Sequence, residues 1–457
     1  MRKSLEQRPN VLILMSDEHR ADVSGYAGDA VIRTPSLDWL SSTGVTFDNA
    51  YTPSPVCVPA RQSIMAGQYP HTTGCECFHQ DLQPGHMTYA RRFSQYGYNA
   101  VCAGKLHHRG PDQLQGWTCR IAGDTKLNNE FAERLVKTKK HSDYSLKWTD
   151  AKELARAGVG RGPHQDDDQF TLNAALNFIR RYFIDSEYDN ATPDEPLMLK
   201  VSFARPHYPY FTDQERFEYY LNRVQPFTGQ EIFEHPILAQ KTLTPGVDVC
   251  ERDIRRAVAA YYGMIESMDD DFQKIFSALE FAGQNLDDWI IVYLSDHGEM
   301  LGEHCVWEKF KFFEGSVRTP FVIRWPKRFA GGGRVTENVS LCDLFATLCD
   351  MCDLPVPEGL DSRSLVPLMD GDATSWDNMV SAEYWGTHLM IKRDHLKYQW
   401  YGPDVPEVLF DLKSDPGEMT NCIGEPQYQE AITFFRNERV ARGFGVDETV
   451  AENISLS

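Results

Sequence analysis

The chain has 457 residues, of which 42% are apolar and 25% charged, a composition that excludes collagen-like and mostly disordered classes. Forty-six basic residues against sixty-six acidic ones leave a formal net charge of −20, the wrong sign for a surface that binds a nucleic-acid backbone. We therefore expect no nucleic-acid partner. An anionic substrate would have to be attracted by a local cluster of cations or by a metal ion.

The spacing of the cysteines and the first residues of the chain indicate the cellular compartment in which the protein is expected. Eleven cysteines are scattered from Cys57 to Cys422 without the even spacing of a disulfide framework, which favours a reducing environment. The only apolar run before Asp17 covers residues 11–15, too short for a signal-peptide core or a membrane span. We expect a cytoplasmic protein, or a periplasmic or secreted one if a leader has been trimmed. No membrane partner is expected, and a homo-oligomer is one of several open states.

Short apolar runs alternate with longer helical patterns up to about residue 370. Segments 171–183 and 265–279 carry apolar residues at helical spacing, typical of helices that pack on a core. The alternation predicts an α/β fold with a large, mostly parallel or mixed sheet sandwiched by helices. The strands are predicted at residues 11–15, 98–103, 197–203, 289–294 and 321–323.

The pattern changes after Asp370 and Gly371. Three short strand-like runs separated by turn residues predict a small antiparallel sheet, and the helical pattern over 427–442 is expected to pack with it. We expect an N-terminal α/β domain over residues 1–370 and a C-terminal subdomain over 371–457. The three runs cover residues 389–392, 395–400 and 408–412.

Two of the predicted strands lead into acidic residues. The first is followed by Asp17 and Glu18, and the fourth by Asp296 and His297. Open α/β sheets bind ligands beyond the carboxyl ends of their strands, so these side chains predict an oxygen-rich site for a hard divalent cation. An acid after a single strand is more often a helix cap, and the pairing of two strand ends is what favours a metal.

A cysteine precedes a predicted helix between residues 55 and 67. Pro59 can occupy the first turn, which puts Cys57 at the positive end of the helix, and Arg61 adds a formal charge one turn further. A lone cysteine is more often a buried structural residue, but the spacing Cys-x-Pro-x-Arg argues against that interpretation.

The segment Cys57-Val-Pro59-Ala60-Arg61 resembles the signature of the sulfatase family, in which the cysteine is oxidised to Cα-formylglycine. Ala60 stands where many members have serine. Lys105 and His107 lie in a second sulfatase-like segment, and at an extended strand end their two-residue spacing would point both to one ligand. Further segments resemble sulfatase motifs in family order along nearly the whole chain. The matching segments are 97–107, 205–209, 295–298, 307–320 and 409–416.

The resemblance implies an enzyme that cleaves a sulfate monoester, of a carbohydrate or a small alcohol, to alcohol and inorganic sulfate. Hydrated formylglycine at position 57 would be the nucleophile, and a formylglycine-generating maturase would be a partner. Arg61 and Lys105 would orient the nucleophile, His107 would take its proton, and His207 and Lys309 would assist the leaving alcohol. Calcium is the metal expected first, with magnesium or manganese behind it. The implied metal ligands are Asp17, Glu18, Asp296 and His297.

The sequence departs from the usual sulfatase pattern at Glu18 and His297, where Asp and often Asn stand. The longer Glu18 side chain could point instead to a neighbouring Lys or Arg. An Asp-His pair is also found in choline sulfatases and phosphonate monoester hydrolases. Two alternatives therefore stay open: a phosphonate monoester or phosphodiester hydrolase using the same formylglycine, and a non-catalytic binding protein with the sulfatase fold.

Several conspicuous residues are left without a role. The Cys349–Cys352 spacing suits a metal, but no second pair completes a tetrahedral site, so helix packing is favoured. Cys75 and Cys77 are unassigned. Four cationic or titratable residues near the motifs could read the organic part of the ester, with surface charges the favoured interpretation: Arg20, His71, His79 and Arg205.

Overall fold

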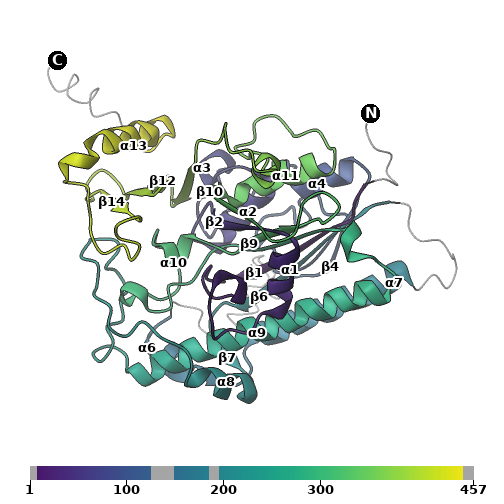
Figure 1. Ribbon diagram of the computed structural model, residues 1–457, viewed down its shortest axis with the longest axis horizontal. Helices are drawn as coiled ribbons and strands as arrows, with labels where there is room; N and C mark the ends of the chain where they lie inside the picture. The colour runs from purple at the N-terminus through teal and green to yellow at the C-terminus, as the bar shows by residue number, and fades with distance from the viewer. Residues whose placement is uncertain (1–7, 125–148, 185–194, 446–457) are drawn as a thin grey trace.

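The computed structural model describes residues 8–124, 149–184 and 195–445. Its centre is an eight-stranded sheet in the order β10-β2-β9-β8-β1-β6-β3-β4 (Figure 1). All pairings are parallel except those of β9, which runs antiparallel to β8 and β2. The sheet is therefore mixed. Its strands are β1 Val11–Asp17, β2 Val45–Tyr51, β3 Asn99–Gly104, β4 Cys119–Ala122, β6 Leu197–Pro206, β8 Ile290–Ser295, β9 Phe321–Arg324 and β10 Gly333–Ser340.

The first five residues of the central strand β1 are apolar, and both faces of this strand are covered. Val11, Ile13 and Met15 belong to one core cluster, while Leu12 and Leu14 belong to another on the opposite face. This division follows from the two-residue period of a strand. The sequence-predicted α/β sandwich is confirmed.

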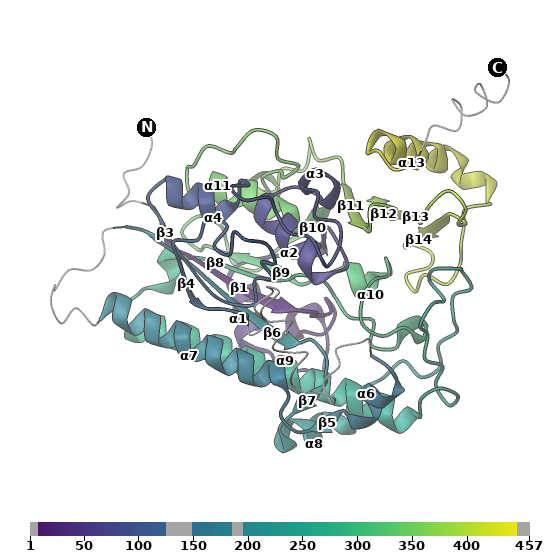
Figure 2. The same cartoon turned by 180° about the vertical axis from the view of Figure 1, so that it is seen from behind.

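Helices lie on both faces of the sheet (Figures 1 and 2). One face carries α1 Pro35–Thr43, α7 Pro163–Phe183 and α9 Glu251–Phe281, whose apolar sides join the cluster of Leu12. The other carries α2 Cys57–Ala66, α4 Tyr89–Gln95 and α11 Leu344–Met351. None of the helices in the three described segments is long and apolar enough to cross a membrane.

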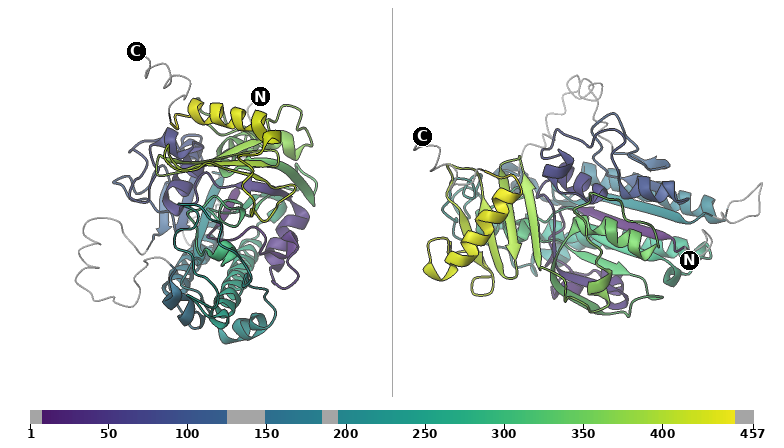
Figure 3. Two further views of the ribbon diagram at one scale, coloured as in Figure 1. Left: turned by 90° about the vertical axis from the view of Figure 1, so that its left-hand side faces the viewer. Right: turned by 90° about the horizontal axis from the view of Figure 1, so that it is seen from above.

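A second, antiparallel sheet follows in the order β11-β12-β13-β14. Helix α13, Gln429–Ala441, packs on one face, and the other face shares a core cluster with Tyr51, Val56 and Phe313 of the main body. The right-hand view of Figure 3 shows this sheet between α13 and the main body. Its strands are β11 Met379–Tyr384, β12 His388–Arg393, β13 Leu396–Trp400 and β14 Val408–Asp411.

Short elements connect these layers. They are η2 Gly25–Ala27, α3 Pro70–Thr73, α6 Ala151–Arg156, β5 Gly158–Val159, β7 Phe211–Thr212, α8 Gln214–Leu221, η3 Leu286–Asp288, η4 Glu303–Cys305, α10 Glu314–Val317, η5 Leu341–Asp343, α12 Val366–Met369 and η6 Pro426–Tyr428.

Candidate active site

The carboxyl ends of β1 and β8 bring the predicted acidic residues together. The two strands are hydrogen-bonded neighbours with Ser16 opposite Ser295, so Asp17 and Asp296 leave the sheet side by side. Glu18 turns away from the strand with a φ of 70°, and its backbone N–H donates to Asp296 Oδ1 at 3.2 Å. The edge predicted from the sequence is therefore the edge where these acids gather.

Helix α2 begins at Cys57, directly above these acids. The Cys57 side chain is 2% exposed, and its Sγ lies 3.8 Å from Asp17 Oδ1 and 3.2 Å from His297 Nε2. One potential ligand atom from each member of a four-residue group lies within 4.8 Å of the others. The group is Asp17, Cys57, Asp296 and His297.

Arg61 links the two strand ends from one turn into α2. Its guanidinium is fully buried and contacts Asp296 Oδ2 at 2.7 Å and Asp17 Oδ2 at 2.9 Å. Lys105 Nζ lies 2.6 Å from the same Asp17 oxygen. Burial alone would raise the pKa of Asp17, but Lys105 and Arg61 hold it well below its ordinary value, so this carboxylate is ionised.

A second cationic group stands at the other side of Asp17. Lys309 Nζ lies 2.8 Å from His207 Nε2 and 3.2 Å from Glu18 Oε1, and Glu18 Oε2 lies 3.4 Å from His207 Nε2. Because His207 Nδ1 faces the Tyr208 carbonyl oxygen at 2.6 Å, Nδ1 carries the hydrogen and the Nε2 lone pair accepts from Lys309. Glu18 thus points to a neighbouring lysine, the orientation its longer side chain allowed.

The charge states of this pair follow from their surroundings. Burial and the adjacent Lys309 lower the pKa of His207 well below its ordinary value, so the imidazole is neutral. Burial opposes the charge on Lys309, yet Cys57, Glu18 and Asp17 raise its pKa well above its ordinary value. Lys309 is therefore an ammonium that donates to a neutral imidazole.

His107 follows Lys105 closely in the chain, but it does not lie in an extended strand as predicted. β3 ends at Gly104, which has a φ of 87°, and His107 itself has a φ of 57°. The expectation that Lys105 and His107 continue an extended strand is therefore wrong. Asp124 holds this turn by accepting from the backbone N–H of His107 at 2.8 Å. Burial, Lys105 and Arg61 lower the pKa of His107 well below its ordinary value, which leaves a neutral ring able to accept a proton.

The Cys57 thiol is poorly suited to act as a nucleophile in its unmodified form. Burial and the negative charge of Asp17 raise its pKa to about 12. The thiolate, which is the reactive form, is therefore scarce near neutral pH.

The donor set fits a divalent cation. His297 Nδ1 faces the Gly298 carbonyl oxygen at 3.0 Å, so Nδ1 carries the hydrogen and the Nε2 lone pair faces the acids. Burial raises the pKa of Asp296, and the nearby Asp17 charge raises it further despite Arg61. Both carboxylate oxygens of Glu18 are buried and form no hydrogen bond with the described residues, although Lys309 forms an ion pair with Oε1. Carboxylates and an imidazole in one buried cluster are ligands that calcium, magnesium or manganese can use.

Three supporting residues were missed by the sequence analysis. Ser202 Oγ accepts from Arg61 at 2.8 Å, and the Tyr261 hydroxyl donates to the Glu18 carbonyl oxygen at 2.7 Å. Glu299 is fully buried and raises the pKa of Glu18, although burial itself is the larger cause. A polar residue in a strand predicted to be buried on both faces was the available signal for Ser202. No pattern pointed to Tyr261.

The residues left without a role are mostly structural. Arg205 is buried between Asp168 and Asp271, at 2.7 and 2.5 Å, and so does not face a substrate. His71 pairs with Glu383 at 2.8 Å. Cys349 and Cys352 lie in a core cluster, which confirms the helix-packing interpretation.

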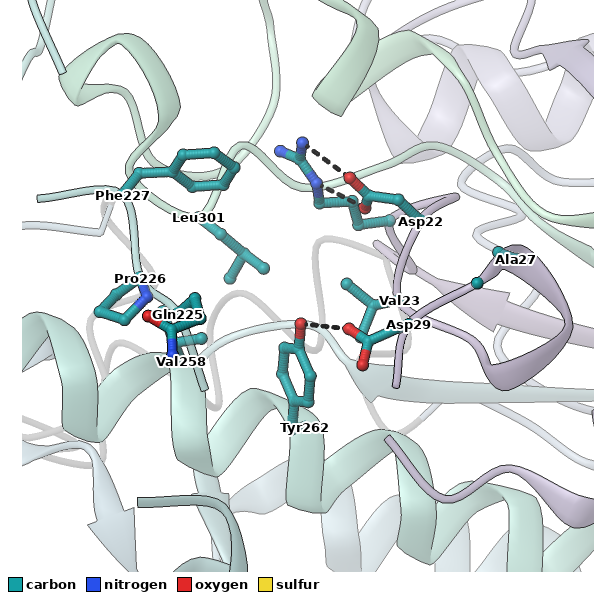
Figure 4. Close-up of a pocket in the computed structure, with 12 residues that line it drawn as sticks. Asp22, Val23, Ala27, Asp29, Gln225, Pro226, Phe227, Val258, Tyr262 and Leu301 are labelled. Atoms are coloured by element: carbon teal, nitrogen blue, oxygen red, sulfur yellow. Dashed lines mark hydrogen bonds and ion pairs between the residues drawn. The ribbon is translucent and has the colours of Figure 1, made fainter. Parts of the chain in front are cut away.

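A pocket of about 270 Å³ lies apart from this cluster. Arg20, tied to Asp22 and Glu303, is one of its lining residues, and none of the ten predicted catalytic or metal-binding residues lines it. Figure 4 shows Tyr262 donating to Asp29 across this pocket, a contact of 2.6 Å. Two pairs of its polar side chains, Arg20 with Asp22 and Tyr262 with Asp29, are already bonded to each other.

The fold and the cluster define a class: hydrolases that bind an anionic ester at the carboxyl edge of a mixed α/β sheet. The comparisons with known proteins name the family. The sulfatase family model matches residues 9–354, and the model of the C-terminal part of N-sulphoglucosamine sulphohydrolase matches residues 302–441. The chain belongs to the sulfatase family and is a sulfuric ester hydrolase, which sets aside the non-catalytic alternative.

Two relatives that are named for a sulfatase activity match almost the whole chain. An arylsulfatase of Clostridium perfringens is 29% identical, over 98% of this chain and 97% of its own length. A choline-sulfatase of Rhizobium meliloti is 31% identical, over 95% of this chain and 86% of its own length.

Among solved structures, the phosphonate monoester hydrolase of Agrobacterium radiobacter has a TM-score of 0.78 at 23% identity and covers 95% of both chains. A protein solved in complex with its substrate D-glucosamine-2-N,6-O-disulfate has a TM-score of 0.75 at 18% identity, covering 95% of this chain and 98% of its own. At these identities the likeness concerns the fold.

Proposed function

We propose that the chain hydrolyses the sulfate monoester of a small alcohol or a sugar through a Cα-formylglycine at position 57 and a divalent metal ion. The observation that carries this proposal is the buried cluster of Asp17, Cys57, Asp296 and His297. Their potential ligand atoms lie within 4.8 Å of one another, and Arg61, Lys105 and Lys309 lie around them. Positive charge fixed where a sulfate ester would react is what this chemistry needs.

The nucleophile in this proposal is the hydrate of the aldehyde, a geminal diol produced after a maturase oxidises Cys57. A divalent cation held by Asp17, Asp296 and His297, with calcium first and magnesium or manganese behind it, would make an oxygen of residue 57 more nucleophilic. The ligand role of Glu18 stays a prediction. Arg61 and Lys105 orient the diol, because both are anchored on Asp17.

The leaving alcohol takes its proton from the other side of the cluster. When one diol oxygen attacks sulfur, it gives up its proton to the Asp17 carboxylate, whose Oδ1 lies 3.8 Å from Sγ of residue 57. The bond from sulfur to the ester oxygen breaks and an alkoxide departs. The Lys309 ammonium, hydrogen-bonded to His207, supplies the proton. A neutral His207 can relay that proton through Nε2.

Release of sulfate completes the cycle. His107 takes the proton of the second diol oxygen, the carbon–oxygen bond to sulfate breaks, and the aldehyde re-forms. A serine or thiolate would instead need a second attack at sulfur. The burial that keeps His107 neutral supports its role as this base.

The experiment uses protein produced together with a maturase. The peptide that contains position 57 should be lighter by about 18 Da than the cysteine form, the mark of the aldehyde. That protein should hydrolyse 4-nitrophenyl sulfate, and a Cys57→Ala variant made in the same way should not. Matured, metal-loaded protein that leaves sulfate esters intact would contradict the proposal.

A phosphonate or phosphate diester hydrolase is the second candidate. It is favoured by the adjacent Asp296 and His297, which together with residue 57 surround Asp17. Rates on 4-nitrophenyl sulfate and on a phenyl phosphonate monoester should be compared with one preparation. If the phosphonate ester is hydrolysed faster than the sulfate ester, the phosphonate hydrolase becomes the first candidate.

A further inference from the structure

The end of β11 and the turn that follows it contact the loop that leads into Cys57. The Glu383 backbone N–H donates to the Pro53 carbonyl oxygen at 2.9 Å, four residues before Cys57, and the Trp385 N–H donates to the Glu76 carbonyl oxygen at 3.1 Å. Figure 2 shows β11 beside α3, the short helix that precedes Glu76. The second sheet therefore presents this turn to two loops that flank the site.

An aromatic stack leads from the site to the surface at this turn. The Tyr384 ring lies 5.9 Å from the ring of Phe310, whose backbone N–H donates to the Pro55 carbonyl oxygen. The Trp385 ring lies parallel to that of Tyr384, at 5.1 Å and 10°. Tyr384 is 8% exposed and Trp385 59%, so the stack begins in the protein and ends with a tryptophan face open to solvent.

The stack is close to the reacting residue. Tyr384 follows Glu383, which is bonded to Pro53, and its ring contacts Phe310, which is bonded to Pro55. Pro53 and Pro55 lie four and two residues before Cys57. A group attached to a sulfate at position 57 would therefore meet this stack on its way out.

A carboxylate without a counter-ion stands beside the stack. The Glu76 side chain lies against Gly386, where an added Cβ would come within 2.9 Å of Glu76 Oε2. No described residue forms a hydrogen bond or ion pair with the Glu76 carboxylate, whereas neighbouring Glu383 is paired with His71. Burial and the Glu383 charge raise the pKa of Glu76, and His71, which is bonded to Glu383, lowers it by a smaller amount. A positive group beside Glu76 would offset both charges.

We propose that Trp385 and Glu76 form a subsite for the alcohol part of the ester, and that this alcohol carries an ammonium group. A tryptophan face attracts a cation, and the unpaired carboxylate adds a formal charge at the same place. A second anionic group on the substrate would be repelled there. A cation already stacked on a ring in this region is Arg109, over Phe78 at 4.2 Å, and the Phe78 ring lies 5.9 Å from that of His107.

This inference rests on the proposed sulfatase activity and selects its substrates. The test uses two esters of one shape that differ in charge, 2-(trimethylammonio)ethyl sulfate and 3,3-dimethylbutyl sulfate, and the same pair lengthened by two methylene groups. We expect wild-type kcat/KM to favour the cationic ester roughly tenfold in at least one pair. Equal rates on both members of both pairs would overturn the inference.

Two variants assign the preference to these side chains. Glu76→Gln and Trp385→Leu should each bring the ratio of cationic to neutral ester toward one, mainly through a higher KM for the cation. Glu280→Gln and Phe170→Leu, which change an exposed acid and an exposed aromatic ring in α9 and α7, should keep the wild-type ratio. A preference that survives both test variants would place the cation elsewhere and refute the subsite.

Failure of the subsite and failure of the activity are distinguishable. Hydrolysis of 4-nitrophenyl sulfate without any preference for charge refutes the subsite alone. If no ester is cleaved, calorimetric titration with phenyltrimethylammonium still decides: binding that Trp385→Leu weakens supports the subsite, and binding that it leaves unchanged, or no binding, refutes it.

Discussion

Lys309 holds the only side-chain hydrogen bond to His207 Nε2 among the described residues, and both side chains are buried. Proton donation matters most for a poor leaving group, because a nitrophenolate can depart without it. Lys309→Met should therefore lower kcat/KM on an alkyl sulfate by about 10²- to 10⁴-fold and on 4-nitrophenyl sulfate much less. Lys327→Met, which changes an exposed lysine, serves as the control. Equal losses on both esters would contradict this role.

Asp17 and Glu18 are adjacent but differ in their partners. Asp17 belongs to the four-residue group around Cys57 and also to a second group with Glu18 and His207. Glu18 belongs only to the second group, where Lys309 lies beside it as a counter-ion. We expect Asp17→Asn to lower bound metal sharply and Glu18→Gln to retain most of it, as measured by elemental analysis after dialysis. Chelation should abolish wild-type turnover, and calcium should restore it. Metal loss by Glu18→Gln as large as that by Asp17→Asn would make Glu18 the ligand that the sequence suggested.

The sequence predicted which residues of the site lie close together, but not the contacts that orient each side chain. Motifs marked Asp17, Cys57, Arg61 and Asp296 because their residue types and spacing are distinctive. The turn that redirects His107 was not foreseeable, since it depends on Asp124, a residue in a later segment. The lysine partner of Glu18 was foreseen only as one option, because the reach of a side chain does not fix its direction.

Strands with a conspicuous run of apolar residues were the predictable ones. Strands β1, β3, β6, β8 and β9 were located within a few residues because both faces are buried and the runs stand out. β2 and β10 were missed, since β2 contains Thr46, Asp48 and Asn49 and β10 alternates exposed and buried residues. β11 was missed as well, its run broken by Ser381 and Glu383. Polar residues within a strand interrupt its apolar pattern. Their hydrogen bonds form only in the folded protein, so the sequence pattern alone does not reveal such a strand.

Helix α9 supports the strands that carry the site. Phe272 packs on Phe203 of β6 and on Tyr293 of β8, with ring centroids 5.6 and 5.4 Å apart. Phe272→Ala should lower the free energy of unfolding by about 3–5 kcal/mol, because it removes a fully buried ring. Phe281→Ala at the end of the same helix, where the ring is 85% exposed, should change it by about 0.5 kcal/mol or less. Urea unfolding of both variants measures the difference.

A buried ionic cluster connects the second sheet to the main body of the protein. Lys397 of β13 contacts Glu314 of the main body at 2.9 Å and also pairs with Glu418. Apolar residues of both parts share one core cluster as well. The boundary near residue 371 stays a prediction: all four strands of the second sheet follow it, but change of composition in a sequence cannot reveal how extensively the parts are packed together.

The ionic cluster should make the stability sensitive to acid. Burial opposes ionisation of Glu314, but Lys397 and Lys392 lower its pKa to about 2, against an ordinary value of 4.5. A lowered pKa in the folded state stabilises the protein above pH 4.5, and this contribution is lost as the pH falls toward about 2. In Glu314→Gln, the free energy of unfolding should fall by roughly 3 kcal/mol less than in the wild type as the pH is lowered through this range. Urea unfolding at successive pH values measures the difference. Glu358→Gln, an exposed acid, should leave the wild-type pH profile unchanged.

The complete enclosure of α2 limits when its first residue can be altered. All ten residues from Cys57 to Ala66 are buried between the sheet and the loops that cover it. No second enzyme could bring its own catalytic groups to that sulfur in the finished protein without displacing the surrounding core. The proposed oxidation therefore belongs to the nascent chain, and protein that has folded with its thiol intact should stay inactive when a maturase is added afterwards.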